Sequence, residues 1–392
     1  MKNKKKIGVI FGGKTAEHDV SIITAHTPII DSLQASNQFE PIPIYISPDG
    51  HWYSNELMND IEYFQNPNLE KKLKKENKVE LLFDEGLKIK KPGFFSKTIE
   101  IDVAFPAMHG TYGEDGSLPG LLRMADVPFV GCDIFASAAA MDKVFTKQLC
   151  SSENIPIVPF VWFTQNDWKH KRNNIKTKIN NLTWPLFVKP VHLGSSIAIS
   201  KVENKNNLED AIEVAFHYDN KVLIEESIEN LTEVTLPILG NEKLKLGAVE
   251  KPEGGEQFFN FEEKYLNENK QSEGVNTAYS EIPADIKKEY LEKTKHLGKR
   301  VYRLLDCSGI ARVDFLIDNQ KEKVYVNEVN TLPGSLYQHN WKQAGLSNLE
   351  LVTKLIELAQ ERYKNQENNA FNFESSVLQN AGGPKIDSEE ED

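Results

Sequence analysis

Four polar residues interrupt two apolar stretches in the C-terminal third of the chain. Arg312 and Asp314 are two residues apart in GIARVDFLID, and Glu328 and Asn330 are two apart in EKVYVNEVN. Because side chains alternate between the two faces of a β-strand, each pair projects from one face of its strand. Three oxygen donors beside an arginine are typical of a Mg²⁺ site that bridges to nucleotide phosphates. The alternative interpretation is an exposed sheet face that carries a salt bridge.

A second candidate is the stretch FVKPVHLGSSIAISKV, in which a strand ends near Lys189 and a turn of Gly194, Ser195 and Ser196 follows. Lys189 could reach phosphates as a point charge, while backbone N–H groups of the turn could fold over phosphate oxygens. A Gly-Ser-Ser turn also occurs in ordinary hairpins. This stretch by itself therefore leaves both interpretations open.

Two glycine-rich loops complete the set. HGTYGEDGSLPGLL places His109 before a helix start, and FGGKTAEHDVS places Glu17 at the beginning of another helix. Free N–H groups at such positions suit anionic ligands, but FGG lacks the three-glycine spacing of a dinucleotide site. A solvated loop histidine and a glutamate that merely interacts with the helix dipole are the alternatives.

The N-terminal third alternates strands with a helix. We expect strands over 7–11, 39–47 and 98–108 and a helix over 18–33, the pattern of an open, mostly parallel sheet. The segment 66–97 is rich in lysine and glutamate and predicts a helix and a hairpin with a solvated face. The fold class is therefore α/β.

The rest of the chain predicts a small α+β central unit and a C-terminal block. The central unit has a helix over 135–154, an edge strand or connector over 155–163, strands over 184–190, 221–228 and 233–241, and a helix over 207–217. The C-terminal block has an amphipathic helix over 283–306, a strand pair over 309–318 and 322–330 turning at Asn319, and a helix over 348–363. We expect domains at 1–133, 134–235 and 236–364, then a disordered acidic tail over 365–392.

Composition narrows the classes of partner. The 392 residues carry a net charge of −12, which argues against a surface that grips nucleic acid. No apolar run approaches the roughly 18 residues of a membrane span, and the first apolar run is too short for a signal peptide. The three cysteines, Cys132, Cys150 and Cys307, are widely spaced, which favours a reducing, cytoplasmic compartment without disulfides.

Taken together, the motifs resemble the D-alanine–D-alanine ligases of the ATP-grasp superfamily, in the same order, from about residue 5 to residue 364. The matching stretches are FGGKTAEHDVS, HGTYGEDGSLPGLL, PFVGCD, AMDK, VKPVHLGSS, EEKYL, GIARVDF and NEVNTLPG. The resemblance implies a three-domain ATP-grasp architecture with an N-terminal open parallel sheet and with ATP between the central and C-terminal domains. It implies that ATP phosphorylates one D-alanine carboxylate and that a second D-alanine attacks the acyl phosphate, giving D-Ala-D-Ala for peptidoglycan precursors.

The resemblance also implies a role for each matching residue. Two Mg²⁺ ions, or Mn²⁺, would lie on Asp314, Glu328 and Asn330. ATP would contact Lys143, Lys189, Glu225, Glu226, Ile228, Glu233 and Lys264, although the segment before Glu233 is one residue longer than usual. The catalytic and first-substrate residues would be Glu17, Ser195, Tyr265, Arg312, Gly334 and His109. The loop over 254–274 would close as a lid, and the enzyme would be a homodimer.

The chain departs from the family after NTLPG. His339 stands where the family usually has the serine that receives the second substrate's carboxylate, and Ala198 stands where it usually has glycine. His339 or Ser335 could still bind that carboxylate, or His339 could be a packed side chain without substrate contact. Other possibilities are a different acceptor (another amino acid, a hydroxy acid or a peptide amine), a more distant ATP-grasp carboxylate–amine ligase, and a non-catalytic nucleotide-binding module.

Overall fold

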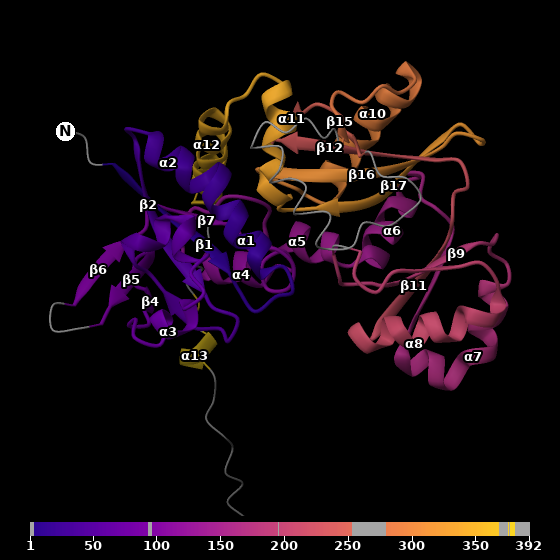
Figure 1. Cartoon of the computed structure of the whole chain (residues 1–392), viewed down its shortest axis with the longest axis horizontal. Helices are drawn as coiled ribbons and strands as arrows, with labels where there is room; N and C mark the ends of the chain where they lie inside the picture. Colours follow the sequence, from indigo (N-terminus) through magenta and orange to yellow (C-terminus); the bar gives the residue numbers. More distant parts are fainter. Residues whose placement is uncertain are drawn as a thin grey trace, which may run out of the picture.

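The computed structural model describes residues 4–92, 96–194, 196–252, 280–367, 375 and 377–380. The chain forms open sheets with helices around them, as expected for the α/β class (Figure 1). The N-terminal sheet lies on the left of Figure 1, with the central sheet at lower right and the C-terminal sheet above.

The N-terminal sheet has the strand order β3-β2-β1-β7, and β1 runs parallel to both β2 and β7. This confirms the predicted open, mostly parallel sheet. Its strands are β1 (Lys5–Gly12), β2 (Phe39–Ile46), β3 (Trp52–Tyr53) and β7 (Val103–Pro106). Gly12 ends β1 with φ +87°, and a Cβ atom there would lie 2.2 Å from the Ile46 carbonyl oxygen. Only glycine fits at this turn into the first helix.

The predicted helix over 18–33 is helical but irregular. The structure has α1 (His18–Thr24), a π-helical stretch η1 (Ala25–Ile30) and α2 (Asp31–Ala35). Pro28 lies inside η1. Because proline has no N–H and its ring crowds the preceding turn, the regular hydrogen-bond ladder cannot continue past it.

The charged segment 66–97 forms the predicted helix and hairpin, but the strand predicted over 98–108 is wrong. It is two strands, β6 (Lys97–Glu100) and β7, which belong to different sheets. Between them the carboxylate of Asp102 accepts a hydrogen bond from the Lys6 N–H at 2.7 Å, which ties the bend to β1. The other elements between residues 56 and 124 are η2 (Glu56–Asn59), η3 (Ile61–Tyr63), α3 (Leu69–Leu73), β4 (Glu80–Phe83), β5 (Leu87–Lys91) and α4 (Ser117–Met124).

The single helix predicted over 135–154 is also wrong. The structure has α5 (Ile134–Met141) and α6 (Lys143–Ser152), separated by Asp142 in an extended conformation. The Asp142 carboxylate accepts a hydrogen bond from the Phe145 N–H and so caps α6. This break places Lys143 at the first position of α6.

The central sheet has the order β10-β9-β11-β8 and is antiparallel, with β8 at the edge as predicted. Helices α7 and α8 lie together below this sheet in Figure 1. Helix α7 was not predicted from the sequence. It begins at a capping box formed by Thr164 and Asp167. The elements are β8 (Phe160–Thr164), α7 (Gln165–Ile179), β9 (Leu186–Pro190), β10 (Ser200–Val202), η4 (Lys205–Asn207), α8 (Leu208–Tyr218) and β11 (Lys221–Glu226).

The C-terminal sheet has the order β13-β12-β16-β17, and β14 pairs with β15 beside it. The apolar stripe of α10 packs on β12, β16 and β17. The elements are β12 (Leu231–Leu239), β13 (Lys245–Leu246), β14 (Lys251–Pro252), β15 (Ser280–Glu281), α10 (Lys288–Leu304), β16 (Ile310–Asp318) and β17 (Lys323–Asn330).

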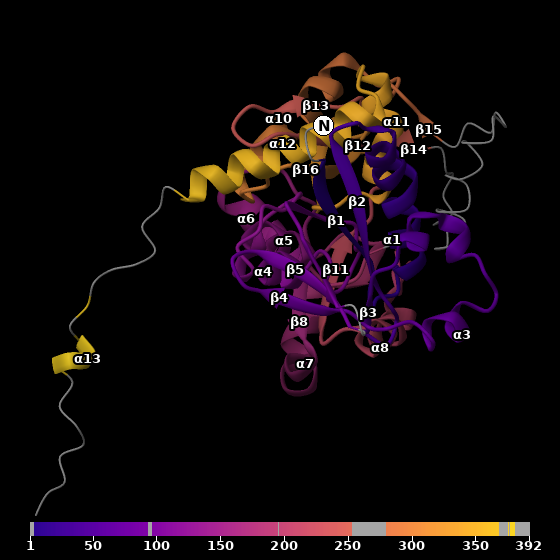
Figure 2. The ribbon, with the colours of Figure 1, turned by 90° about the vertical axis from the view of Figure 1, so that its left-hand side faces the viewer.

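The chain then returns to the N-terminal sheet through η5 (Gly334–Tyr337), α11 (Gln338–Gln343) and α12 (Asn348–Glu367) (Figure 2). Buried α12 residues such as Leu355 share a core with Ile7 and Ile29. Helix α12 ends three residues beyond the expected domain limit at 364, and a short helix α13 (Val377–Asn380) follows. Among the described residues, no helix is both long and apolar enough to cross a membrane.

Candidate functional site

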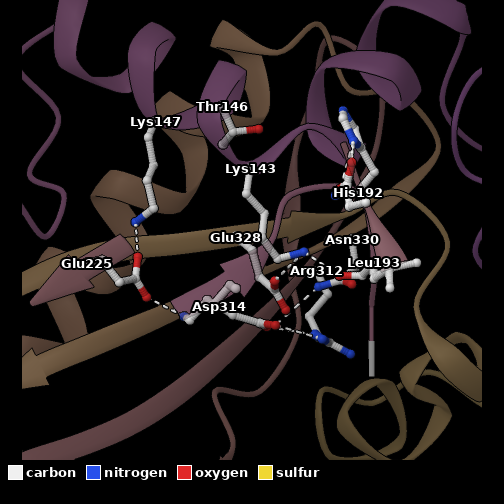
Figure 3. Close-up of polar contacts among 12 residues, drawn as sticks. Lys143, Thr146, Lys147, His192, Leu193, Glu225, Arg312, Asp314, Glu328 and Asn330 are labelled. Carbon is white, nitrogen blue, oxygen red and sulfur yellow. Dashed lines mark hydrogen bonds and ion pairs between the residues drawn. The ribbon is translucent and has the colours of Figure 1, made fainter. Parts of the chain in front are cut away.

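The strand pair β16–β17 brings the four predicted polar residues together (Figure 3). Arg312 lies opposite Asn330 and Asp314 lies opposite Glu328, just before a β-bulge. The Arg312 guanidinium donates to both Asp314 oxygens, from Nε and Nη2, at 2.6 Å each. The Asn330 amide donates to Asp314 Oδ2 at 3.1 Å. Burial opposes the charge of Arg312, but Asp314 outweighs it and raises the pKa of Arg312.

These residues fit a divalent cation. Asp314, Glu328 and Asn330 offer two carboxylates and one amide oxygen, the hard donors that Mg²⁺ prefers. The side chains of Asp314 and Glu328 are 14 % and 29 % exposed, so a ligand can approach them from one side. In the described part of the chain, this site included, no three histidine, cysteine or acidic residues are grouped so that they could hold a metal by themselves. The donor set therefore depends on Asn330 as the third ligand.

Lys143 links this face to the turn after β9. Its Nζ donates to the Leu193 carbonyl oxygen at 2.7 Å and lies 3.5 Å from Glu328 Oε2. The Lys143 ammonium group, at the start of α6, thus lies between the candidate metal ligands and the candidate phosphate-binding turn (Figure 3). Ala198 in that turn has φ +57°, the left-handed region that favours glycine.

A buried ion-pair triad lies on the neighbouring sheet. The Glu225 carboxylate contacts Lys147 Nζ at 2.9 Å through one oxygen and Lys189 Nζ through the other. Glu225 and Lys147 are each 1 % exposed. Burial raises the pKa of Glu225, but the two ammonium groups outweigh burial and lower it to about 2. Sequence analysis missed Lys147, although its position four residues after Lys143 places both on one face of α6.

Three other predicted ATP contacts lie on or just after β11 and on β12. Glu226 accepts a hydrogen bond from the Thr183 N–H at 2.9 Å, and Ile228 is half-buried beyond the end of β11. Glu233 lies on β12, where its charge helps to raise the pKa of Lys189 against the opposing effect of burial. The strands therefore bring Glu225 and Glu233 near the same lysine.

A second group of polar residues lies where the N-terminal loops meet the chain after β17. His109 is 3 % exposed, so it is not a solvated loop residue. Its Nε2 contacts Thr24 Oγ1 at 2.8 Å, and the same oxygen accepts a hydrogen bond from the Ser335 N–H at 2.9 Å. Burial lowers the pKa of His109. Sequence analysis missed Thr24, because its partners are 85 and 311 residues away.

Glu17 belongs to the same group of residues and is buried. A Cβ atom on Gly110 would lie 2.6 Å from Glu17 Oε2, and one on Gly194 would lie 3.5 Å from it. Glu17 is therefore placed between the His109 loop and the turn after β9. Glu114, another missed residue, accepts hydrogen bonds from the Gly110 and Leu332 N–H groups. Burial and the nearby Glu17 raise the pKa of Glu114 to about 8.

The segment after the Pro-Gly turn is unusual in its backbone. Ser335, Leu336 and Tyr337 all have φ near +50°, a left-handed turn that begins directly after Gly334. The Tyr337 ring packs against the Arg312 guanidinium at 4.8 Å, and its centroid is 5.4 Å from that of His339. His339 Nε2 lies 3.5 Å from Glu250 Oε2, and the His339 side chain is 31 % exposed. This segment therefore joins Arg312 to a partly accessible histidine.

Ser195, Lys264, Tyr265 and the predicted lid over 254–274 lie outside the described residues. The other predicted site residues form two main groups. The first contains the cations and carboxylates of α6, β9, β11, β16 and β17, and the second contains the residues around Glu17 and His109 with the segment after Gly334. One group carries cations beside a hard-oxygen face, and the other carries a buried carboxylate beside an imidazole. This arrangement can bind a nucleotide with a divalent ion next to a small zwitterion.

Comparisons with known proteins agree with this arrangement. Residues 6–132 match the family model described as D-ala D-ala ligase N-terminus, and residues 149–357 match D-ala D-ala ligase C-terminus. The chain is 36 % identical to the D-alanine–D-alanine ligase of Natranaerobius thermophilus, with 95 % of this chain and 100 % of that protein covered. It is 37 % identical to that of Thermosipho melanesiensis, over 92 % of this chain and 95 % of that one.

Two solved structures are similar over the whole fold. The VanG D-Ala:D-Ser ligase from Enterococcus faecalis superposes with a TM-score of 0.75 and 34 % identity, covering 91 % of this chain and 100 % of that one. The D-alanine–D-alanine ligase from Coxiella burnetii superposes with a TM-score of 0.77 and 28 % identity, covering 93 % and 96 %.

Proposed function

Since the chain belongs to the D-alanine–D-alanine ligase family, we propose that the residues gathered at this site carry out the ATP-dependent joining of two D-alanine molecules. The chain is an ADP-forming ligase, and peptidoglycan synthesis is the role of its family. The observation that carries the assignment of residues is the contact of Lys143 with both the Leu193 carbonyl and Glu328. It joins a candidate phosphate site to a candidate metal site.

Nucleotide binding is assigned to the cationic group. Lys143 and Lys189 would neutralise phosphate charge, and the segment Glu225 to Ile228, with Glu226 between them, would line the base. Glu233 would hold the ribose, and Lys264 would contact the terminal phosphate. Asp314, Glu328 and Asn330 would hold the divalent ion that this family uses, and we assign two Mg²⁺ ions, with Mn²⁺ as a substitute. Bound there, such ions would neutralise the negative charge that develops on the phosphates during phosphoryl transfer.

The first D-alanine is assigned to the residues around Glu17 and His109. The buried Glu17 carboxylate would pair with its ammonium group, and His109 would lie near its carboxylate. Arg312 and the Gly334 N–H would stabilise the oxyanion that forms when the amine of the second substrate attacks the acyl phosphate. Ser195 and Tyr265 would orient Glu17, and the segment 254–274 would keep water from the acyl phosphate. Positioning and charge stabilisation thus supply most of the catalysis.

Three further assignments complete the proposal. We place domain limits near 133, 235 and 364, and the gap between the two family matches, at 132 and 149, supports the first limit. We propose a homodimer, and the exposed side chains of Met124, Ile134 and Phe135 on the adjoining α4 and α5 support such pairing. We place the enzyme in the cytoplasm, in keeping with three buried free cysteines.

The decisive experiment measures phosphate release from ATP and Mg²⁺ with and without D-alanine, followed by mass spectrometry of the products. We expect release that depends on D-alanine and yields D-Ala-D-Ala. Release without this dipeptide would point to a different acceptor, and D-serine is the first to test, since one similar structure is a D-Ala:D-Ser ligase. Phosphate release that does not depend on D-alanine would contradict the assignment of the first D-alanine to the residues around Glu17 and His109.

The acceptor carboxylate is assigned to His339. Its imidazole is 31 % exposed, lies 3.5 Å from the Glu250 carboxylate and is close to Tyr337, which packs on Arg312, so an anion can reach it. We expect His339→Ala to raise the KM for the second D-alanine by about tenfold or more, because a charge-assisted hydrogen bond is lost. The KM for ATP should stay the same.

Steady-state kinetics over a range of D-alanine concentrations separates the two amino acid sites. His296→Ala is the matched control, because His296 is exposed on α10 of the same domain. An unchanged second KM in His339→Ala would show that this histidine only packs, and would transfer the assignment to Ser335.

A further inference from the structure

His192 lies two residues after the end of β9 and is held by two carboxylates from different elements. Its Nδ1 lies 3.0 Å from Asp219 Oδ2, and its Nε2 lies 3.3 Å from Asp142 Oδ2. Its backbone N–H also donates to Asp219 Oδ2 at 2.7 Å. The position is thus fixed through the main chain and through both ring nitrogens.

The two carboxylates belong to the elements that carry the nucleotide site. Asp142 caps α6 and immediately precedes Lys143, while Asp219 follows α8 and accepts from the Lys221 N–H at the start of β11. Lys221 Nζ also donates to Asp142 Oδ2 at 2.6 Å. The residue after His192 is Leu193, whose carbonyl oxygen receives Lys143 Nζ (Figure 3). One imidazole therefore spans α6, β11 and the turn.

The charges around the imidazole favour its protonated form. The carboxylates of Asp142 and Asp219 contact it directly. The Lys221 ammonium group lies 2.6 Å from Asp142 Oδ2, and Lys143 Nζ donates to the carbonyl oxygen of the next residue, Leu193. Hydrogen bonds to Asp142 and Asp219 raise the pKa of His192 to about 9. In turn, His192 and Lys221 lower the pKa of Asp142 against the effect of burial. At neutral pH the cluster holds an imidazolium between two carboxylates.

We propose that His192 is a positioning residue that fixes Leu193 and Gly194 against Lys143 and thereby sets the affinity of the enzyme for nucleotide. This inference rests on the proposed role of Lys143 and the turn in phosphate binding. No substrate contact is assigned to His192. Its effect comes from holding α6 and the turn in one geometry, because a displacement of about 1 Å in a binding group can cost large factors in activity.

The test compares His192→Gln and His192→Arg with His170→Gln, a control in which an exposed histidine of α7 changes in the same way. Calorimetry with ADP and Mg²⁺ gives the dissociation constant, and kinetics gives the KM for ATP and for D-alanine. We expect His192→Gln to weaken ADP binding and raise the KM for ATP by about tenfold. The KM for D-alanine should change less than twofold.

Arginine can pair with two carboxylates and stays charged at every accessible pH, so His192→Arg should bind ADP nearly as the wild type does. The pH dependence separates positioning from simple loss of structure. Wild-type affinity should fall as the pH rises through about 9, where the imidazolium is lost, while His192→Arg keeps its affinity. His192→Gln should be weak at every pH.

Two results would overturn the inference and are distinguishable from each other. Equal ADP affinity in the wild type and His192→Gln would show that His192 does not set the geometry, while the proposed function stands. A wild-type protein without ADP affinity would overturn the proposed function as well. If His192→Gln does not fold, the pH profile of His192→Arg decides, since an alkaline loss equal to that of the wild type contradicts the role of His192.

Discussion

Replacement of Glu328 by glutamine is expected to lower kcat for D-alanine-dependent phosphate release by about a hundredfold to a thousandfold. Glu328 lies across the strand pair from Asp314 and 3.5 Å from Lys143. Glutamine keeps the size of the side chain and removes its charge. The proposed divalent ion would then lose an anionic ligand, and Lys143 would lose its neighbouring carboxylate.

The measurement is phosphate release over a range of Mg²⁺ concentrations, with thermal unfolding as a check on folding. Glu328 suits this test better than Asp314, because Asp314→Asn would leave the buried Arg312 guanidinium without its carboxylate partner. Glu322→Gln is the control, since Glu322 lies at the far end of the same strand pair and contacts Lys287 on the surface. Full Mg²⁺-dependent activity in Glu328→Gln would contradict the assignment of the metal ligands.

Alternation within strands explains why this part of the site could be predicted. Arg312 and Asp314 must share a face of any strand that contains both, and the same holds for Glu328 and Asn330. Whether the two residue pairs lie on the same face of the sheet depends on the register between β16 and β17. The structure supplies it by pairing Arg312 with Asn330, and no local pattern specifies that pairing.

The residues that sequence analysis missed all act through distant partners. Thr24 joins His109 to Ser335, and Lys147 on helix α6 is paired with Glu225 on strand β11, far away in the sequence. Likewise, the helix break at Asp142 depends on a capping aspartate that propensity alone does not separate from an ordinary helical one. Local sequence therefore indicated which residue types carry the chemistry, while long-range packing determined what holds them in place.

The second large effect is on stability, and it concerns Glu225. Glu225→Gln leaves the ammonium groups of Lys147 and Lys189 in a buried site without a carboxylate. Breaking a buried ion pair by removing one partner typically costs about 3–5 kcal/mol. We expect a loss of that size in the free energy of unfolding and a fall of about 5 °C in Tm.

Urea and thermal unfolding measure this loss, and Glu226→Gln is the matched control. Glu226 is the next residue on β11, is half-buried, and accepts a single hydrogen bond from the Thr183 N–H. Its replacement should cost less than about 1 kcal/mol. The double variant Lys147→Met, Glu225→Gln should recover part of the loss, because one of the two unpaired charges is gone. A double variant less stable than Glu225→Gln alone would contradict the electrostatic explanation.

The pH dependence of the stability difference between the wild type and Glu225→Gln identifies the cause of that difference. The pKa of Glu225 is about 2 in the folded protein and near its ordinary value of 4.5 in the unfolded chain. Folding therefore gains from the ionised carboxylate above pH 4.5, and the gain is lost as the pH falls through 2. The stability gap between the wild type and Glu225→Gln should be constant near neutrality and shrink below pH 4.5. A gap that stays unchanged at pH 3.5 would mean that lost packing, and not lost charge, explains the effect of the substitution.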